Sequence, residues 1–232
     1  MSTKKTVLIA TPTWNRKDIL RLTAEALQAS DLRLDTTDYI ISDDASTEFT
    51  EDELKTMFPW ADIIRHRQKH THPLLNTHFC FDTFLQGTYD TLVILDSDMI
   101  VAPDWRRRLD ELTATPGFTI GSLYNSTHHV SSEDHGTYLI KASAGFAGMV
   151  FSRGLLHTLK GLLGKSFDDW RVCHTVGKKF HVSKPSALAH IGINGQWNGN
   201  DYSTLDKAAD FDWNSVDPEI KAGCELLLRV SL

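Results

Sequence analysis

Two acidic residues separated by one serine, Asp96 and Asp98, follow directly after the aliphatic run 92–95. In an extended chain alternate side chains project from the same face, so these two carboxylates would repel each other unless a cation joins them. Carboxylate oxygens are hard ligands that suit Mg²⁺ or Mn²⁺, and these ions often keep coordination positions open for substrate phosphates. The triplet therefore predicts a divalent-metal site, with a solvated turn after a strand as the alternative.

Two further polar loops follow predicted strands upstream of this triplet. Asp43 and Asp44 follow the apolar run 39–41, and their carboxylates could accept hydrogen bonds from a nucleobase imide or from ribose hydroxyls. Capping of a helix by Asp44 or Ser46 is the alternative. The loop at 11–16 offers a rigid turn, an aromatic face and polar groups that could hold a nucleotide. Its candidate residues are Pro12, Thr13, Asn15 and Arg16.

Short apolar runs alternate with helix-like segments over the first 98 residues. Strands are expected at 7–10, 39–41, 61–64 and 92–95, with helices from about 17 and around 79–85. This rhythm predicts an α/β fold with a parallel sheet, whose ligands bind in the crevice outside the carboxyl ends of the strands. The three polar loops are therefore expected to share one crevice. Asn15 is expected to cap the first helix.

The pattern is looser after residue 101. Helices are expected near 104–112 and 154–163, and strands at 149–151 and 186–189 are expected to add to a mixed sheet. The chain predicts one domain over 1–232: a nucleotide-binding half over about 1–100, an acceptor and catalytic half over about 101–197, and an arm over about 198–232. The arm is expected to end in a short amphipathic helix at about 218–230.

The order and spacing of the motifs 11–16, 43–46 and 96–98 resemble those of family 2 glycosyltransferases of the GT-A fold. Looser likeness continues through 145–153, 167–170 and 177–190, so that the resemblance covers about residues 6–195. It implies a Rossmann-like mixed sheet flanked by helices. It also implies that Pro12, Asp43 and Asp96 line a nucleoside pocket beside Ser97, and that Asp98 binds the Mn²⁺ or Mg²⁺ that bridges the donor diphosphate.

The same resemblance implies an inverting, metal-dependent transfer of sugar from a nucleoside-diphosphate sugar to an acceptor hydroxyl, in polysaccharide or glycoconjugate synthesis. Asp169 would be the general base, which removes the proton of the attacking hydroxyl. Asp168 fills the place of the acidic residue that precedes the base in this family, so the choice between the two stays open. His190 matches a position near the diphosphate or metal, and we include it as a candidate ligand.

Other motifs carry weaker signals. The glycine- and amide-rich segment 192–200 suits a lid whose Trp197 stacks on the donor sugar, with a plain surface loop as the equal alternative. A histidine cluster at 66–78 lacks a zinc-ligand pattern. The segment 161–166 ends like a phosphate-binding loop but lacks the motif's first glycine.

Composition narrows the function classes. With 24 basic and 30 acidic side chains, the formal net charge of −6 gives no broad attraction to nucleic acid. No apolar run reaches the roughly 20 residues that span a bilayer. Three widely spaced cysteines predict a cytoplasmic protein without disulfides. Peripheral membrane association and oligomerisation stay compatible with the sequence. The alternatives are a nucleotidyltransferase, which would need a glycine- and cation-rich first loop, and an inactive nucleotide- or carbohydrate-binding module.

Overall fold

A nine-stranded mixed sheet organises the chain in the computed structural model, which describes residues 5–177, 179–192 and 206–232. The strand order is β3-β2-β1-β4-β9-β6-β10-β8-β7. The strands of this sheet, in chain order, are β1 Val7–Thr13, β2 Thr37–Asp43, β3 Asp62–Arg65, β4 Thr91–Ile94, β6 Ile120–Ser122, β7 Ser131–Asp134, β8 Tyr138–Lys141, β9 Met149–Ser152 and β10 Phe180–Ser183. The helices are α1 Lys17–Gln28, α2 Glu51–Met57, α3 Pro73–Gln86, α4 Trp105–Thr113, α5 Arg153–Leu163, α6 Asp169–Val176 and α7 Pro218–Leu228, with short 3₁₀ turns at Gly164–Ser166 and Trp213–Ser215.

The first half forms the predicted parallel sheet. Strand β1 pairs in parallel with β2 on one side and with β4 on the other, and β2 pairs in parallel with β3. The chain order therefore reverses direction across the sheet between β1 and β4, which is where ligands bind in open α/β sheets. The parallel strands expected from the apolar runs are confirmed, each within a few residues of its predicted bounds.

The second half makes the sheet mixed, as predicted. Strand β9 pairs antiparallel with both β4 and β6, and β10 pairs in parallel with β6. The expectation that 186–189 would join this sheet is wrong. That segment forms β11, Leu188–His190, which pairs antiparallel with β5, Met99–Val101, in a separate two-stranded sheet. The chain turns at residues 97–98 after β4, so β5 leaves the main sheet and offers β11 a different edge.

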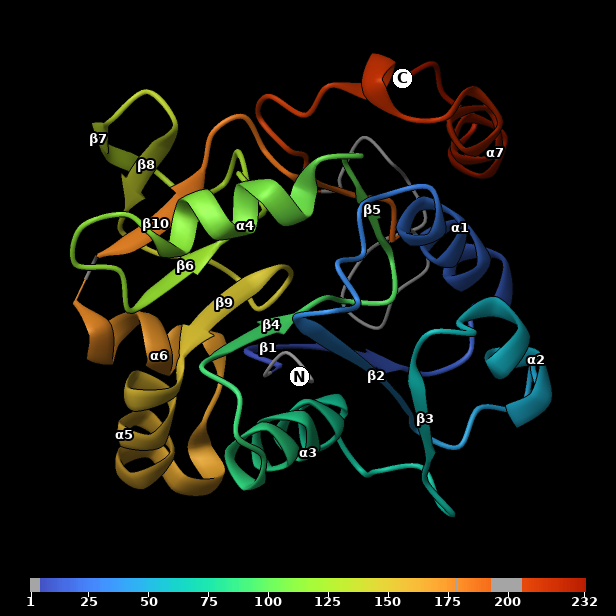
Figure 1. Ribbon diagram of the computed structural model, residues 1–232, viewed down its shortest axis with the longest axis horizontal. Helices are drawn as coiled ribbons and strands as arrows, with labels where there is room; N and C mark the ends of the chain where they lie inside the picture. Colours follow the sequence, from blue (N-terminus) through green and yellow to red (C-terminus); the bar gives the residue numbers. More distant parts are fainter. Residues whose placement is uncertain (1–4, 178, 193–205) are drawn as a thin grey trace.

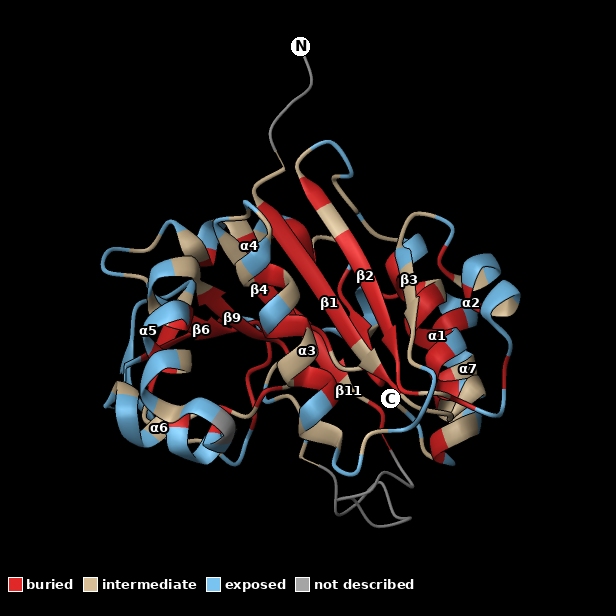
Figure 2. Cartoon of the chain, turned by 90° about the horizontal axis from the view of Figure 1, so that it is seen from below, coloured by how far each residue is buried: buried red, intermediate tan, exposed pale blue. Residues whose placement is uncertain are grey.

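Two apolar cores cover the two faces of the sheet (Figure 1). Alternate residues of β1 point to opposite faces, as the pleat requires: Ile9 joins the core with α1, α4 and α7, and Leu8 joins the core with α3, α5 and α6. Figure 2 shows β1 and β4 buried between these layers. Burial on both faces explains why these strands are almost wholly aliphatic.

The start of α1 differs from the prediction. Asn15 does not cap it, because the Asn15 side-chain oxygen accepts hydrogen bonds from the Thr47 and Glu48 amides at 2.8 and 3.4 Å. Arg16 precedes the helix instead, in a left-handed conformation (φ 59°, ψ 50°) and without a capping hydrogen bond from its side chain. The Asn15 side chain therefore binds the loop after β2 and does not cap α1 as predicted.

Helix α3 begins earlier than its predicted core around 79–85. His72 caps it, and Pro73 occupies the first turn, where its missing N–H costs nothing. Its first half is polar yet partly buried: Asn76 lies under β2, where it donates to the Ser42 carbonyl at 2.8 Å. This polarity hides the helix from an apolar-periodicity argument.

The end of the chain packs on the first helix. Helix α7 lies against α1, and it buries Ile220, Cys224 and Leu228 in the same core. Across the described residues, no helix is both long and apolar enough to cross a bilayer.

Helix α5 offers a matched test of the second core. Leu159 is 1% exposed and packs under the sheet, whereas Leu162 in the same helix is 68% exposed. We expect Leu159→Ala to lower the free energy of unfolding by about 2–5 kcal/mol, and Leu162→Ala to change it by less than about 0.5 kcal/mol. Urea denaturation of the two variants measures both values, and equal losses would contradict the assigned packing.

Candidate functional site

The three polar loops converge at the carboxyl ends of β1, β2 and β4. Thr13 and Asp43 lie opposite each other in the parallel register, and the Asp44 amide donates to the Thr13 carbonyl at 2.9 Å. The Asn15 amide donates to the Ser46 hydroxyl at 2.8 Å. Arg16 reaches from the first loop to the acidic triplet. The three loops therefore lie together at one edge of the sheet.

Asp98 is the electrostatic centre of this crevice. Its side chain is 7% exposed, and its Oδ2 accepts from the Arg16 guanidinium at 2.8 Å and lies 3.3 Å from Nε2 of His190. The second Arg16 nitrogen donates to the Ser97 hydroxyl at 3.2 Å. The other carboxylate oxygen, Oδ1 of Asp98, is buried without a hydrogen-bond partner. A buried acceptor without a hydrogen-bond partner destabilises the folded protein unless a bound ligand supplies the missing partner.

The pKa values of Asp96 and Asp98 shift in opposite directions. Loss of solvent, followed by the charge of Asp98, raises the pKa of Asp96 to about 7. Burial also pushes the pKa of Asp98 upward, but His190 and Arg16 outweigh it and hold that pKa below the usual carboxyl range. His190 shows the reverse balance, because Asp98 overcomes its burial and raises its pKa. Asp98 is thus the permanent anion of the pair.

The short second sheet places His190 beside Asp98. Pairing of β11 with β5 sets His190 opposite Met99, and the Ile191 amide donates to the Asp98 carbonyl at 2.9 Å. The next residue must be small: a Cβ at Gly192 would lie 2.0 Å from Oδ2 of Asp98. Glycine therefore permits the chain to pass directly against the carboxylate.

Asp98 and His190 fit a divalent cation as a partial ligand set. Two ligands at right angles around one such ion lie about 3 Å apart, close to the 3.3 Å between Asp98 Oδ2 and His190 Nε2. No group of three or more His, Cys, Asp or Glu side chains converges as a metal cage within the part of the chain that the structure describes. An ion bound here would keep positions for substrate phosphates, as Mg²⁺ and Mn²⁺ commonly do.

The acidic pair after β2 is buried and internally bonded. Asp43 accepts from the Ser46 amide at 3.2 Å and lies 3.3 Å from Nε of Arg65, while its Oδ2 has no hydrogen-bond partner. Asp44 accepts from the backbone amide and the ring of His70 at 2.9 and 2.6 Å. Neither Asp44 nor Ser46 caps a helix, because Thr50 caps α2 through a capping box. The carboxylates of Asp43 and Asp44 instead form part of the sheet edge where the three polar loops meet.

The loop after β1 supplies the opposite wall. Pro12 lies half-buried in β1, opposite Ser42 of β2, and Thr13 is buried with a hydroxyl that lacks a partner. Trp14 carries the Lys69 ammonium over its ring, 2.9 Å from the centroid. The two loops thus face each other across the place where the sequence predicts a nucleoside.

The structure separates the two candidate bases. Asp168 caps α6, and its Oδ1 accepts from the Arg171 amide at 2.8 Å. Asp169 is the first residue of the helix; its side chain is solvent-accessible, and desolvation raises its pKa. Its charge also raises the pKa of Asp96, which places the two in one electrostatic environment. Asp168 therefore holds the helix end, whereas the solvent-accessible Asp169 carboxylate is electrostatically coupled to Asp96.

Several contributors had only weak sequence signals. Arg65 and His70 complete the acidic pair after β2. Within the histidine cluster, His66 and His70 pack edge to face with ring centroids 4.7 Å apart, while His72 caps α3 and His78 bonds to the Phe167 carbonyl at 2.7 Å. His129 bonds to Ser143 at 2.7 Å, and its charge lowers the pKa of Asp169. Only the fold brings these residues to the site. Trp197 and the predicted lid fall outside the described residues.

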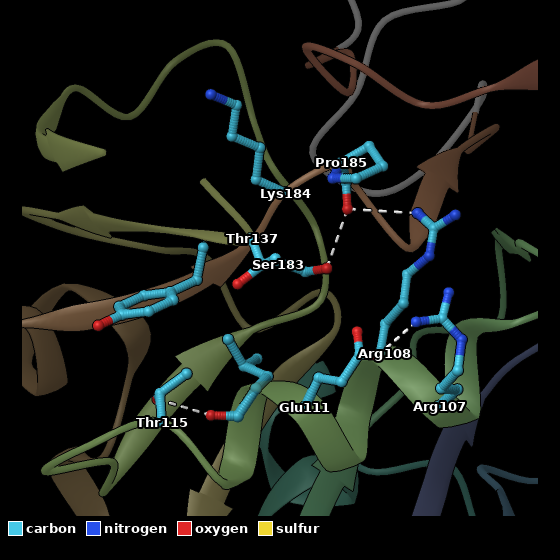
Figure 3. A pocket seen from close by; sticks show the side chains of 10 residues that line it. Arg107, Arg108, Glu111, Thr115, Thr137, Ser183, Lys184 and Pro185 are labelled. Atoms are coloured by element: carbon cyan, nitrogen blue, oxygen red, sulfur yellow. Dashed lines mark hydrogen bonds and ion pairs between the residues drawn. The ribbon is translucent and has the colours of Figure 1, made fainter. Parts of the chain in front are cut away.

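A cavity of about 290 Å³ lies apart from these residues, between α4, Tyr138 and the turn 183–185 (Figure 3). None of the predicted site residues lines it. Its cations are engaged by neighbouring acids: Arg107 and Arg108 pair with Asp104, and Lys184 pairs with Asp134. The cavity therefore has no unpaired cation to attract an anionic substrate.

Solved structures share this fold. PcManGT, a mannosyltransferase from Pyrobaculum calidifontis solved with GDP-Man and Mn²⁺, aligns with a TM-score of 0.54 and 18% identity, covering 78% of this chain and 57% of that one. Residues 1–349 of TarS from S. aureus with UDP-GlcNAc align with a TM-score of 0.57 and 11% identity, covering 79% and 57%. GalNAc-T7 with UDP, GalNAc and Mn²⁺ gives 0.62 and 11%, covering 80% and 43%. The chain spans less than two thirds of the length of each.

Comparison of the sequence with models of protein families identifies the family of this chain. Comparison with curated protein sequences gives no significant match. The model of glycosyl transferase family 2 matches residues 8–136, which is more than half of the 232 residues and contains all three polar loops. The similar structures agree with it at the level of the fold. The chain belongs to glycosyl transferase family 2 and has the GT-A fold.

Proposed function

We propose that the protein transfers a sugar from a nucleoside-diphosphate sugar to an acceptor hydroxyl with inversion of the anomeric carbon. The observation that carries the proposal is the buried Asp98 carboxylate, flanked by Arg16 and His190 at the carboxyl end of β4. Family membership supports the reaction class and disfavours the nucleotidyltransferase alternative. The neighbours bind GDP-Man, UDP-GlcNAc or UDP, so UDP and GDP are the first nucleotides to test.

The nucleoside would lie between the loops after β1 and β2. The half-buried Pro12 and the unpartnered hydroxyl of Thr13 line one side, and Asp43 lines the other. The Oδ2 of Asp43 accepts no hydrogen bond and lies 3.3 Å from Nε of Arg65, so it is an acceptor suited to an N–H of a base bound beside that guanidinium. Asp96, with its pKa raised to about 7, can donate to or accept from a ribose hydroxyl.

Asp98 and His190 would hold a divalent cation, Mn²⁺ or Mg²⁺, against the donor diphosphate. When bound, such an ion neutralises the charge that develops on the departing nucleoside diphosphate. The orphaned Oδ1 of Asp98 and the spacing to His190 support this assignment. Arg16 adds a positive charge at the same place.

Asp169 would act as the base. It takes the proton of the acceptor hydroxyl as that oxygen attacks the anomeric carbon, and a single base acting in one displacement inverts the configuration. Its accessible carboxylate and raised pKa support this role. Asp168 keeps the base in place by capping α6.

We further propose that the protein acts in the cytoplasm and that its acceptor is a carbohydrate or glycoconjugate. The three cysteines are unpaired, and Cys80 and Cys224 are buried, as suits a reducing compartment. The formal charge of −6 makes nucleic acid an unfavourable acceptor.

The metal role predicts the behaviour of Asp98→Asn. The amide keeps the shape of the side chain but removes its charge, so Mn²⁺-dependent stabilisation by UDP or GDP should disappear, and donor hydrolysis should fall at least about 100-fold. Thermal shift with and without Mn²⁺ measures the first, and release of nucleoside diphosphate measures the second. Full Mn²⁺ dependence in this variant would refute the assignment.

The two acidic residues at α6 give a paired test of the base. Asp169→Asn should bind nucleotide normally and lose about 10²–10⁴-fold in kcat, since general-base catalysis typically contributes that much. Asp168→Asn should keep most activity, because asparagine also caps helices well. Kinetics on a donor that turns over measure both variants, and the opposite ranking would reverse the roles.

The pH profile tests the same base independently. The deprotonated carboxylate is the active form, so kcat should fall as pH drops through the pKa of Asp169. Because desolvation raises that pKa, the acidic limb should lie above the value of about 4 of an ordinary aspartate. The charge of Asp168 contributes to that rise, so Asp168→Asn should keep the acidic limb but move it towards lower pH. A wild-type limb at or below the ordinary value would count against Asp169.

A further inference from the structure

Arg16 is paired with Oδ2 of Asp98, the carboxylate oxygen that lies beside His190 and that a metal ion held by both residues would use. Its Nη1 lies 2.8 Å from Oδ2 of Asp98, and His190 lies 3.3 Å from that same oxygen. The unpartnered oxygen, Oδ1, is on the other side of the carboxylate and is buried. The cation that neutralises Asp98 in this structure is therefore an arginine from a different loop.

The backbone of this loop is fixed while the guanidinium can reach out. Asn15 is held by the Ser46 hydroxyl and the Thr47 amide, and the Lys17 amide donates to Glu48 at 3.0 Å. The Arg16 side chain is 28% exposed, in contrast to 7% for Asp98. Arg16 thus keeps a solvent-accessible part of its side chain while it is paired with the more deeply buried Asp98.

A guanidinium and a divalent cation compete for one carboxylate. Both are positive, and in a poorly solvated site their mutual repulsion is strong at such short range. A diphosphate offers the guanidinium a better partner, because phosphate oxygens accept two parallel N–H bonds from arginine. Arg16 therefore has an alternative position only when a nucleotide is bound.

We propose that Arg16 gates the metal site: it holds Asp98 until a nucleoside diphosphate arrives, and its move to the diphosphate frees Oδ2, so that nucleotide and metal bind cooperatively. This inference rests on the proposed function and adds an order to it. Arg16 acts on the metal through Asp98, as a positioning residue. By linkage, the nucleotide strengthens metal binding by the same factor as the metal strengthens nucleotide binding.

The test compares Arg16→Gln with Arg21→Gln. Arg21 lies in α1, the helix that Arg16 precedes, and its side chain is 53% exposed and paired with Glu25, so its loss controls for a removed positive charge. Calorimetric titration of the full chain with MnCl₂ is run alone and with saturating UDP or GDP. For wild type and Arg21→Gln, nucleotide should tighten Mn²⁺ binding about tenfold or more. Arg16→Gln should bind Mn²⁺ alone about tenfold more tightly than wild type and lose most of the enhancement.

The outcomes separate the gate from the function. If Arg16→Gln melts like wild type and binds Mn²⁺ alone no more tightly, Arg16 only orients Asp98 and the gate is refuted. If the nucleotide enhancement persists in this variant, the gate is refuted as well while the proposed function stands. If wild type binds neither nucleotide with Mn²⁺, the proposed function fails and takes the gate with it.

Discussion

Burial of β1 on both faces is the constraint on which the rest of the structure depends. A parallel strand covered by helices on each side is aliphatic where it is covered, as β1 is over its first four residues, and it pairs with strands on both edges. Its residues supply both apolar cores, and its two neighbours, β2 and β4, pair in parallel with its opposite edges. All polar chemistry is consequently displaced to the ends of these strands, where backbone pairing stops and side chains can turn towards solvent.

At that edge of the sheet, several carboxylates are buried where little water can stabilise their negative charge. Asp43, Asp44 and Asp98 are almost fully buried, and each has a cationic or imidazole neighbour: Arg65, His70 and Arg16 respectively. Isolated buried carboxylates would take up protons instead of remaining charged. The partners keep the site ionised and organised before substrate arrives, so less rearrangement is left to the binding step.

Much of this architecture could be predicted from the sequence, and the failures have physical causes. Apolar runs such as 92–95 located the central strands, because two-sided burial leaves a strong local pattern. Asn15 was misassigned as a cap because its true partners, the Thr47 and Glu48 amides, are distant in sequence. Strand β11 pairs outside the main sheet, and no local signal distinguishes one edge from another. Residue types indicated Asp98 and the α6 pair, but only the fold distinguished Asp168, which caps, from Asp169, which is accessible.

The left-handed backbone at Arg16 has a consequence for how this position can vary. Glycine would adopt that conformation without steric cost, whereas an arginine gives up roughly 1–2 kcal/mol there. Glycine at position 16 would relieve that backbone cost, but it would also leave the buried Asp98 carboxylate without its arginine partner, and loss of one partner of a buried ion pair is strongly destabilising. The ion pair with Asp98 therefore accounts for an arginine in a backbone conformation that favours glycine.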